Sequence, residues 1–153
     1  NNELYPYAKK NAGVRKFKSV VIAGFGAGGL SALDIAWNHP DKIGRVGVFS
    51  GAFSRKEKNV SDTSASGMMY EKLKSSRKRP KLQYWLYAGN SGSTGLQKDD
   101  ATQIKPATDS IAELLKSKSF TADDDIVYQK GATNEIKAWK QVLPGFLEWA
   151  FGK

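Results

Sequence analysis

Residues 20–30 read Val-Val-Ile-Ala-Gly-Phe-Gly-Ala-Gly-Gly-Leu, an apolar run followed by a glycine-rich turn and the start of an amphipathic segment. The run Ser19–Ala23 has no polar face, which predicts a strand covered on both faces and flanked at both edges, as in the middle of a parallel sheet. The spacing of apolar residues predicts a helix over Ala27–Asn38 that ends before Pro40. A strand, a tight turn and a helix in this order indicate an α/β fold.

The rest of the chain continues the alternation of strands and helices. Strands are predicted over Arg45–Phe49, Leu82–Tyr87 and Ile126–Gln129, and helices over Glu3–Lys10, Gly67–Ser75, Thr108–Lys118 and Ile136–Phe151, the last interrupted at Leu143-Pro144. A polar loop is predicted over Ser50–Ser66 and a flexible turn over Asn90–Gly95. Such alternation implies right-handed crossovers, so we expect one domain over residues 1–153, a three-layer α/β fold with about four parallel strands.

Composition excludes several classes of protein. The 153 residues contain 40% hydrophobic residues, enough for a core, and no cysteine, which excludes disulfides and thiolate metal sites. No apolar run approaches the ~20 residues of a membrane span, so we expect no membrane contact. The net charge of +9 is densest over residues 72–81, but no aromatic residue is interleaved there to stack bases, so we do not expect nucleic-acid binding.

Acidic clusters and the chain start add two expectations. Asp99-Asp100 and Asp123–Asp125 lack a calcium-loop pattern with a central glycine, so we expect no metal site, and we expect no cofactor. Because residue 1 is Asn and no leader follows it, we expect a piece of a longer polypeptide.

The glycine turn allows two functional interpretations from its residues alone. Gly24, Gly26 and Gly29 form G-x-G-x-x-G between a strand and a helix, which is typical of a dinucleotide-binding (Rossmann-like) domain. That interpretation requires an acidic residue at the end of the next strand, yet residues 48–51 contain none. Alternatively, the turn is a nucleophile elbow of the G-x-S-x-G type, with Gly26 at the middle position.

A longer set of motifs resembles one family. These motifs are the turn at Gly24, Asn38–Gly44 with its H-P-D, Phe49–Phe53 with its F-S-G-A, Gly131–Glu135, the pattern from Trp139 through Pro144 to Trp149, and Glu3–Tyr7. Together they resemble the "putative esterase" family of α/β-hydrolases, which includes feruloyl and enterochelin esterases. The resemblance follows the whole chain but only the second half of the usual fold. It implies a partial α/β-hydrolase fold and favours the elbow interpretation.

The resemblance also implies that the catalytic triad is lost. The family's nucleophile falls on Gly26, its base on Thr133, and its acid near Asn90, Ser91 and Gly92, none of which supplies the required group. Only the N–H of Ala27 would remain as an oxyanion-like donor. We therefore expect a non-catalytic, ligand-binding or scaffolding part of a larger protein, with residual carboxylic-ester hydrolysis as the alternative.

Partners follow from the same resemblance. A small ester or carbohydrate ligand would meet a rim formed by Phe53, Asn90, Thr133 and Asn134. The apolar strand Ser19–Ala23 comes first in the chain, so the neighbour that it needs is an upstream half-domain or a second copy of the chain. The family resemblance alone favours a bacterial, secreted or periplasmic protein.

Overall fold

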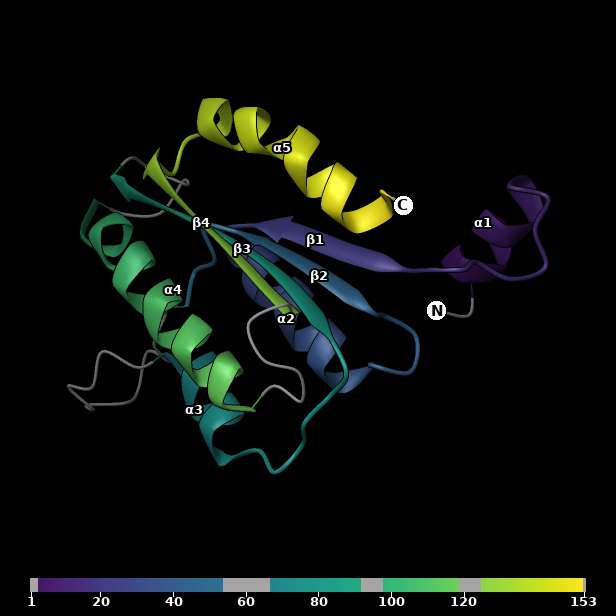
Figure 1. Ribbon diagram of the computed structural model, residues 1–153, viewed down its shortest axis with the longest axis horizontal. Helices are drawn as coiled ribbons and strands as arrows, with labels where there is room; N and C mark the ends of the chain where they lie inside the picture. The colour runs from purple at the N-terminus through teal and green to yellow at the C-terminus, as the bar shows by residue number, and fades with distance from the viewer. Residues whose placement is uncertain (1–2, 54–66, 92–97, 119–124, 153) are drawn as a thin grey trace.

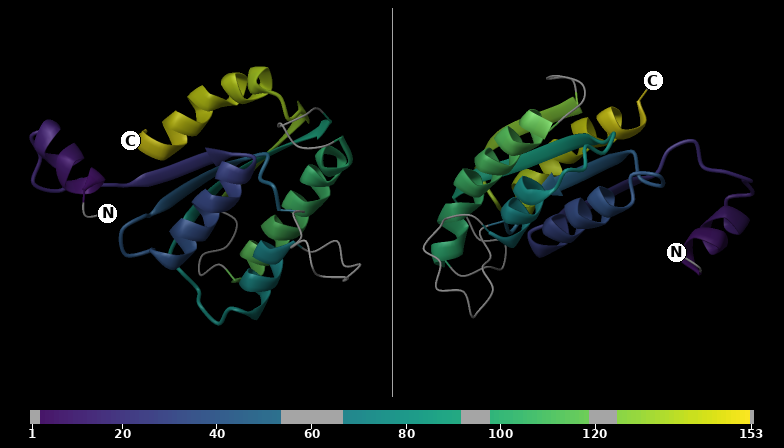
Figure 2. Two further views of the ribbon diagram at one scale, coloured as in Figure 1. Left: turned by 180° about the vertical axis from the view of Figure 1, so that it is seen from behind. Right: turned by 90° about the horizontal axis from the view of Figure 1, so that it is seen from below.

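The computed structural model describes residues 3–53, 67–91, 98–118 and 125–152 (Figure 1). Four parallel strands form one sheet in the order β1-β2-β3-β4: β1 Val21–Phe25, β2 Arg45–Phe49, β3 Gln83–Ser91 and β4 Ile126–Thr133. The helices are α1 Leu4–Asn11, α2 Ala27–Asn38, α3 Met68–Ser75, α4 Lys98–Lys118 and α5 Ile136–Phe151. α2, α3 and α4 cover one face of the sheet and α5 covers the other (Figure 2), which confirms the three-layer α/β architecture.

The first strand is shifted toward the turn relative to the prediction. It begins at Val21, not Ser19, and continues through Gly24 to Phe25. Gly24 stays in the strand because α2 packs against it: an added Cβ would lie 2.2 Å from the carbonyl oxygen of Gly28. Glycine here therefore permits close approach of a helix and does not end the strand.

The last two strands are longer than predicted. β3 extends to Ser91 and β4 to Thr133, and the two remain in register up to the Ser91–Thr133 pair. The predicted turn at Asn90 is therefore strand for its first two residues, and its remaining residues lie outside the described parts of the chain. Pairing between the two strands supplies backbone hydrogen bonds that local propensity does not reveal.

Two helices continue through proline. α4 begins at Lys98, ten residues before the predicted start, and contains Pro106, and α5 is continuous through Pro144. Pro144 is exposed, whereas Phe146 and Ala150 beyond it are buried against the sheet. Proline has no N–H group, so water can donate instead to the helix carbonyl that lacks this partner. Apolar packing beyond the proline stabilises the last turns of the helix.

The sheet separates two hydrophobic clusters. On the α5 face, the ring centroid of Phe146 lies 5.2 Å from that of Phe49 and 5.9 Å from that of Trp85. Tyr87 is buried in the same cluster. Tyr84 faces the opposite cluster, under α2, α3 and α4. The aromatic residues of β3 are at most 5% exposed, so they belong to the core of the protein.

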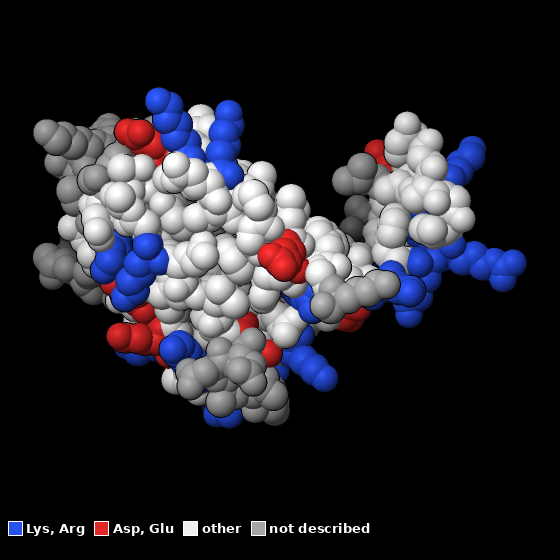
Figure 3. All heavy atoms as spheres, turned by 45° about the horizontal axis from the view of Figure 1, so that its top comes forward, with Lys and Arg blue, Asp and Glu red and all other residues white. Residues whose placement is uncertain are grey.

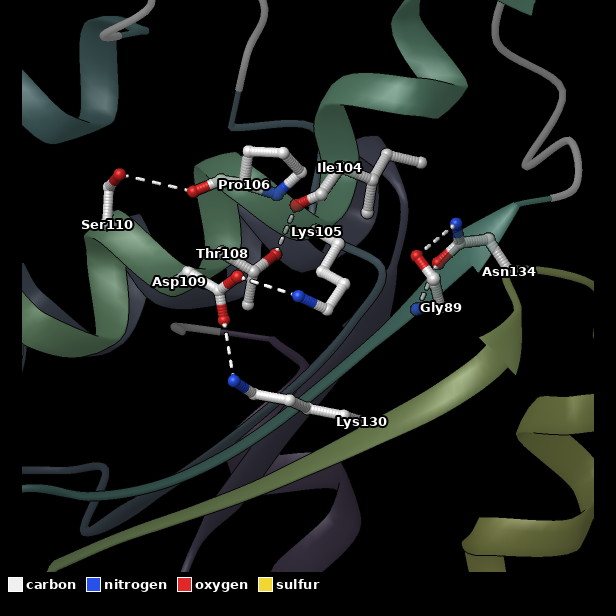
Figure 4. A network of polar contacts seen from close by, with 9 residues as sticks. All are labelled: Gly89, Ile104, Lys105, Pro106, Thr108, Asp109, Ser110, Lys130 and Asn134. Atoms are coloured by element: carbon white, nitrogen blue, oxygen red, sulfur yellow. Dashed lines mark hydrogen bonds and ion pairs between the residues drawn. The ribbon is translucent and has the colours of Figure 1, made fainter.

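An ionic contact fixes α4 to β4. Asp109 on α4 lies 3.0 Å from the ammonium of Lys105 and 3.2 Å from that of Lys130 on β4 (Figure 4). Burial would raise the pKa of the Asp109 carboxyl, but the hydrogen bonds from Lys105 and Lys130 outweigh it and hold the pKa below its usual 3.8.

The β1 edge of the sheet is exposed. Among the described residues β1 pairs only with β2, so the second neighbour that its apolar sequence predicts is not one of the described strands. Ala23 is exposed and Phe25 is 43% exposed. Figure 3 shows a broad uncharged surface on the α5 side, and a notch separates it from the part of the chain that carries α1. An apolar edge of this kind is a template for pairing with another strand.

We expect the isolated chain to self-associate through β1, because pairing would cover this edge. Sedimentation at low micromolar concentration should show species larger than a monomer, and Ala23→Lys should shift the protein to monomer by placing a charge at the edge. Met68→Lys, at a 48% exposed position on α3, is the matched control and should not change the distribution. A wild-type monomer whose β1 amides exchange rapidly would contradict this expectation.

The contact of Asp109 gives a pH dependence of stability. Because the folded-state pKa lies below the unfolded value of 3.8, the ionised carboxylate stabilises the fold above that pH, and the contribution is lost as the pH falls through the folded-state pKa. Asp109→Asn should therefore destabilise the protein at pH 7 and have little effect at the acid end of a series of denaturation curves. An equal effect at both ends would contradict the lowered pKa.

Candidate functional site

The turn between β1 and α2 has the backbone of a tight elbow. Gly26 has φ +55° and ψ −120°, a conformation that L residues rarely adopt. Its N–H donates to the carbonyl oxygen of Phe49 (2.9 Å), and its own carbonyl accepts from the N–H of Ala52 (3.0 Å). The turn is therefore fixed to the segment that follows β2, and glycine occupies its strained position with the least strain.

The other two glycines of the turn serve packing. A Cβ on Gly24 would collide with the backbone of Gly28, and a Cβ on Gly29 would lie 3.0 Å from both the carbonyl of Gly24 and Cγ1 of Val48. Both glycines thus allow α2 to lie directly on β1. The G-x-G-x-x-G spacing is explained by contacts within the protein, without a dinucleotide.

The three positions predicted to correspond to a catalytic triad lie at one edge of the sheet. Gly26 follows β1, Thr133 ends β4 and Ser91 ends β3, and all strands are parallel, so these ends share the carboxyl edge. Ser91 and Thr133 are register partners. Asn90, beside them, is exposed, and Gly92 lies outside the described residues.

Ala27, the predicted oxyanion-like donor, lies at the same edge. Ala27 is the first residue of α2 and is exposed. Its position in the first turn leaves its N–H without an acceptor inside the helix. The N–H group is therefore available to an oxygen atom of a bound molecule.

Asn134 has a structural role that the sequence did not reveal. It is fully buried, and its amide accepts from the N–H of Gly89 (2.7 Å) and donates to the carbonyl of Gly89 (3.0 Å; Figure 4). Its Oδ1 also accepts from the hydroxyl of Ser50 (2.6 Å), which in turn accepts from Nε1 of Trp139 (3.0 Å). The expectation that Asn134 forms part of a ligand rim is therefore corrected: its amide joins β2, β3 and α5.

Phe53 does not lie on the expected rim either. It is 1% exposed and packs in the cluster under α2, α3 and α4. It borders a small cavity of about 130 Å³ together with Tyr70, Pro106 and Ile111. Burial of its aromatic ring in the core is favourable because it removes apolar surface from water. Asn90 and Thr133 are therefore the accessible members of the predicted rim.

The histidine of the sequence does not lie near Gly26. His39, the only histidine, caps the far end of α2, where its backbone N–H donates to the carbonyl of Ile35 (3.0 Å). Twelve helical residues separate it from Gly26, a distance of about 18 Å. Within the described ranges no cluster of three or more His, Cys, Asp or Glu could hold a metal ion, and none of the described helices is long and apolar enough to cross a membrane.

Removing the Asn134 amide should destabilise the fold. Asn134→Ala leaves the buried Ser50 hydroxyl and both backbone groups of Gly89 without their partner, so we expect a loss of about 2–4 kcal/mol in the free energy of unfolding. Chemical denaturation measures this loss. Asn90→Ala, at an exposed asparagine of the same edge, is the control and should change stability by less than about 0.5 kcal/mol. Equal effects would show that the amide network is not stabilising.

Comparison with known proteins identifies a family and several similar solved structures. A sequence model of the family described as "Putative esterase" matches residues 1–150, and no curated protein matches. The enterobactin esterase of Shigella flexneri with 2,3-dihydroxy-N-benzoyl-glycine is similar in structure (TM-score 0.72, 23% identity, 97% of this chain and 37% of that one). The ferric enterobactin esterase of Salmonella typhimurium is also similar (TM-score 0.67, 23% identity, 95% and 33%). The chain spans about a third of the length of these structures.

Proposed function

The chain belongs to the family described as "Putative esterase", and from this we propose that it is an esterase-like domain that does not catalyse hydrolysis and acts as a ligand-binding or scaffolding part of a larger protein. The family membership also favours the elbow interpretation of the glycine turn over the dinucleotide-binding one. Residual carboxylic-ester hydrolysis is the alternative that an assay must exclude.

The backbone of Gly26 is the observation that carries the proposal. The residue has the strained dihedral angles of an elbow, at the junction of a strand and a helix, but no side chain with which to attack an acyl carbon. Loss of one triad member lowers the rate by roughly 10⁴- to 10⁶-fold. The tight turn therefore supports an esterase-like architecture, while its residue type argues against covalent catalysis.

The base-equivalent position supports the same proposal. Thr133 carries a hydroxyl, which cannot accept a proton at neutral pH. Its carbonyl oxygen accepts a hydrogen bond from the hydroxyl of Tyr87 (2.7 Å), a contact that orients the backbone at the end of β4. The exposed N–H of Ala27 could stabilise an oxyanion, but one donor without a nucleophile and a base supplies little rate enhancement.

The carboxyl edge of the sheet is the proposed binding surface. Asn90 and Ala27 are exposed there and Thr133 is half-buried, so the edge offers amide, N–H and hydroxyl groups to a small ester or a carbohydrate. The Shigella flexneri relative was solved with a benzoyl-glycine derivative, an example of the small ligands found with this fold. The exposed β1 edge would join this surface to an upstream half-domain or to a second copy.

We expect no saturable hydrolysis of p-nitrophenyl acetate or of a feruloyl ester above the buffer rate. Gly26→Ala is the matched control and should leave the background rate unchanged, because neither residue carries a nucleophile. A serine-directed phosphonate should not label the wild-type chain. Saturable turnover that the phosphonate abolishes would contradict the proposal and support residual hydrolysis.

A further inference from the structure

The opposite edge of the sheet also carries a strand with one neighbour. β4 has eight residues, Ile126–Thr133, and within the described part of the chain it pairs only with β3. An edge strand of this length presents backbone groups to which an extended peptide can bind.

A groove runs along this edge. It has a volume of about 510 Å³, and Gln129–Thr133 of β4 form one wall. The other wall consists of the first turns of α5, through Lys137, Ala138, Gln141 and Val142. Five consecutive strand residues facing two turns of a helix form a slot for an extended chain, and the volume is within the range of ordinary ligand sites.

The lysine on β4 does not block the slot. Lysine on an edge strand commonly prevents pairing with other chains. Here the ammonium of Lys130 lies 3.2 Å from Asp109 and 5.2 Å from the centre of the Tyr128 ring. These contacts hold the side chain on the α4 side of the sheet, as Figure 4 shows, away from α5.

The chemistry of the slot favours an acidic segment. Lys137 is exposed and forms no ion pair with any described residue, so it can bind a carboxylate. Gln129 and Gln141 add exposed amides. The Tyr87 hydroxyl fills the space beside Gly131, where an added Cβ would lie 2.0 Å from it, so this part of the slot is closed, and the half-buried Ala138 and Val142 on the α5 wall can accept a small apolar side chain.

We propose that the groove between β4 and α5 binds an acidic peptide in extended conformation, which joins the sheet beside β4 with a carboxylate at Lys137 and a small apolar side chain against Ala138 and Val142. This site shares only Thr133 with the proposed ligand edge. It requires neither a triad nor a small-molecule ligand, so it is independent of the proposed function.

Fluorescence anisotropy with a labelled, end-capped peptide, Thr-Val-Asp-Val-Thr, tests whether the charge of Lys137 contributes to binding. Lys137→Glu should weaken binding about tenfold, because attraction becomes repulsion. Lys140→Glu, at an exposed α5 position outside the groove, is the matched control and should bind like the wild type. Thermal unfolding verifies that both variants are folded. Equal binding by wild type and Lys137→Glu, or no binding at about 1 mM peptide, overturns the proposal.

Backbone methylation of the peptide tests strand pairing. In an added strand, alternate N–H groups face β4, so methylating one alternate set of amides should abolish binding and methylating the other set should preserve it. Identical affinity of both methylated peptides overturns the pairing. Capped aspartate that binds as tightly as the whole peptide would assign the groove to small anions and likewise overturn the proposal.

Discussion

The buried amide of Asn134 holds the carboxyl edge of the sheet together. One side chain satisfies both backbone groups of Gly89 and the hydroxyl of Ser50, in a place where water cannot replace any of these partners. Since an unsatisfied buried polar group is costly, the ends of β2, β3 and β4 are fixed relative to one another. The position of Thr133, next in the chain to Asn134, follows from this constraint and needs no ligand to maintain it.

The architecture of the elbow is separable from its chemistry. Gly24 and Gly29 bring α2 onto β1 by the absence of side chains, and hydrogen bonds to Phe49 and Ala52 fix the backbone at Gly26. None of these contacts uses a nucleophilic side chain. The turn therefore does not depend on a nucleophilic side chain, and a glycine at its strained position bears less strain than a serine would.

The sequence predicted elements bounded by local signals and missed features that depend on distant partners. α2 and β2 have the predicted bounds because a glycine turn, a proline and apolar periodicity mark them. β3 and β4 were predicted too short, since each is extended by pairing with the other. The burial of Asn134 and Phe53 was missed for a similar reason: polarity and position after a strand suggest exposure, but hydrogen bonding and packing across the fold decide it.

The strand order has a kinetic consequence. Each strand pairs with the one that follows it in the chain, so every step of sheet formation closes a single crossover. A chain leaving the ribosome could therefore add strands in the order of synthesis, although each parallel pairing must close a long crossover and is slow to form. The four strands would then join the sheet in the order β1 to β4, and α5 would cover the aromatic cluster only after all four strands have been synthesised.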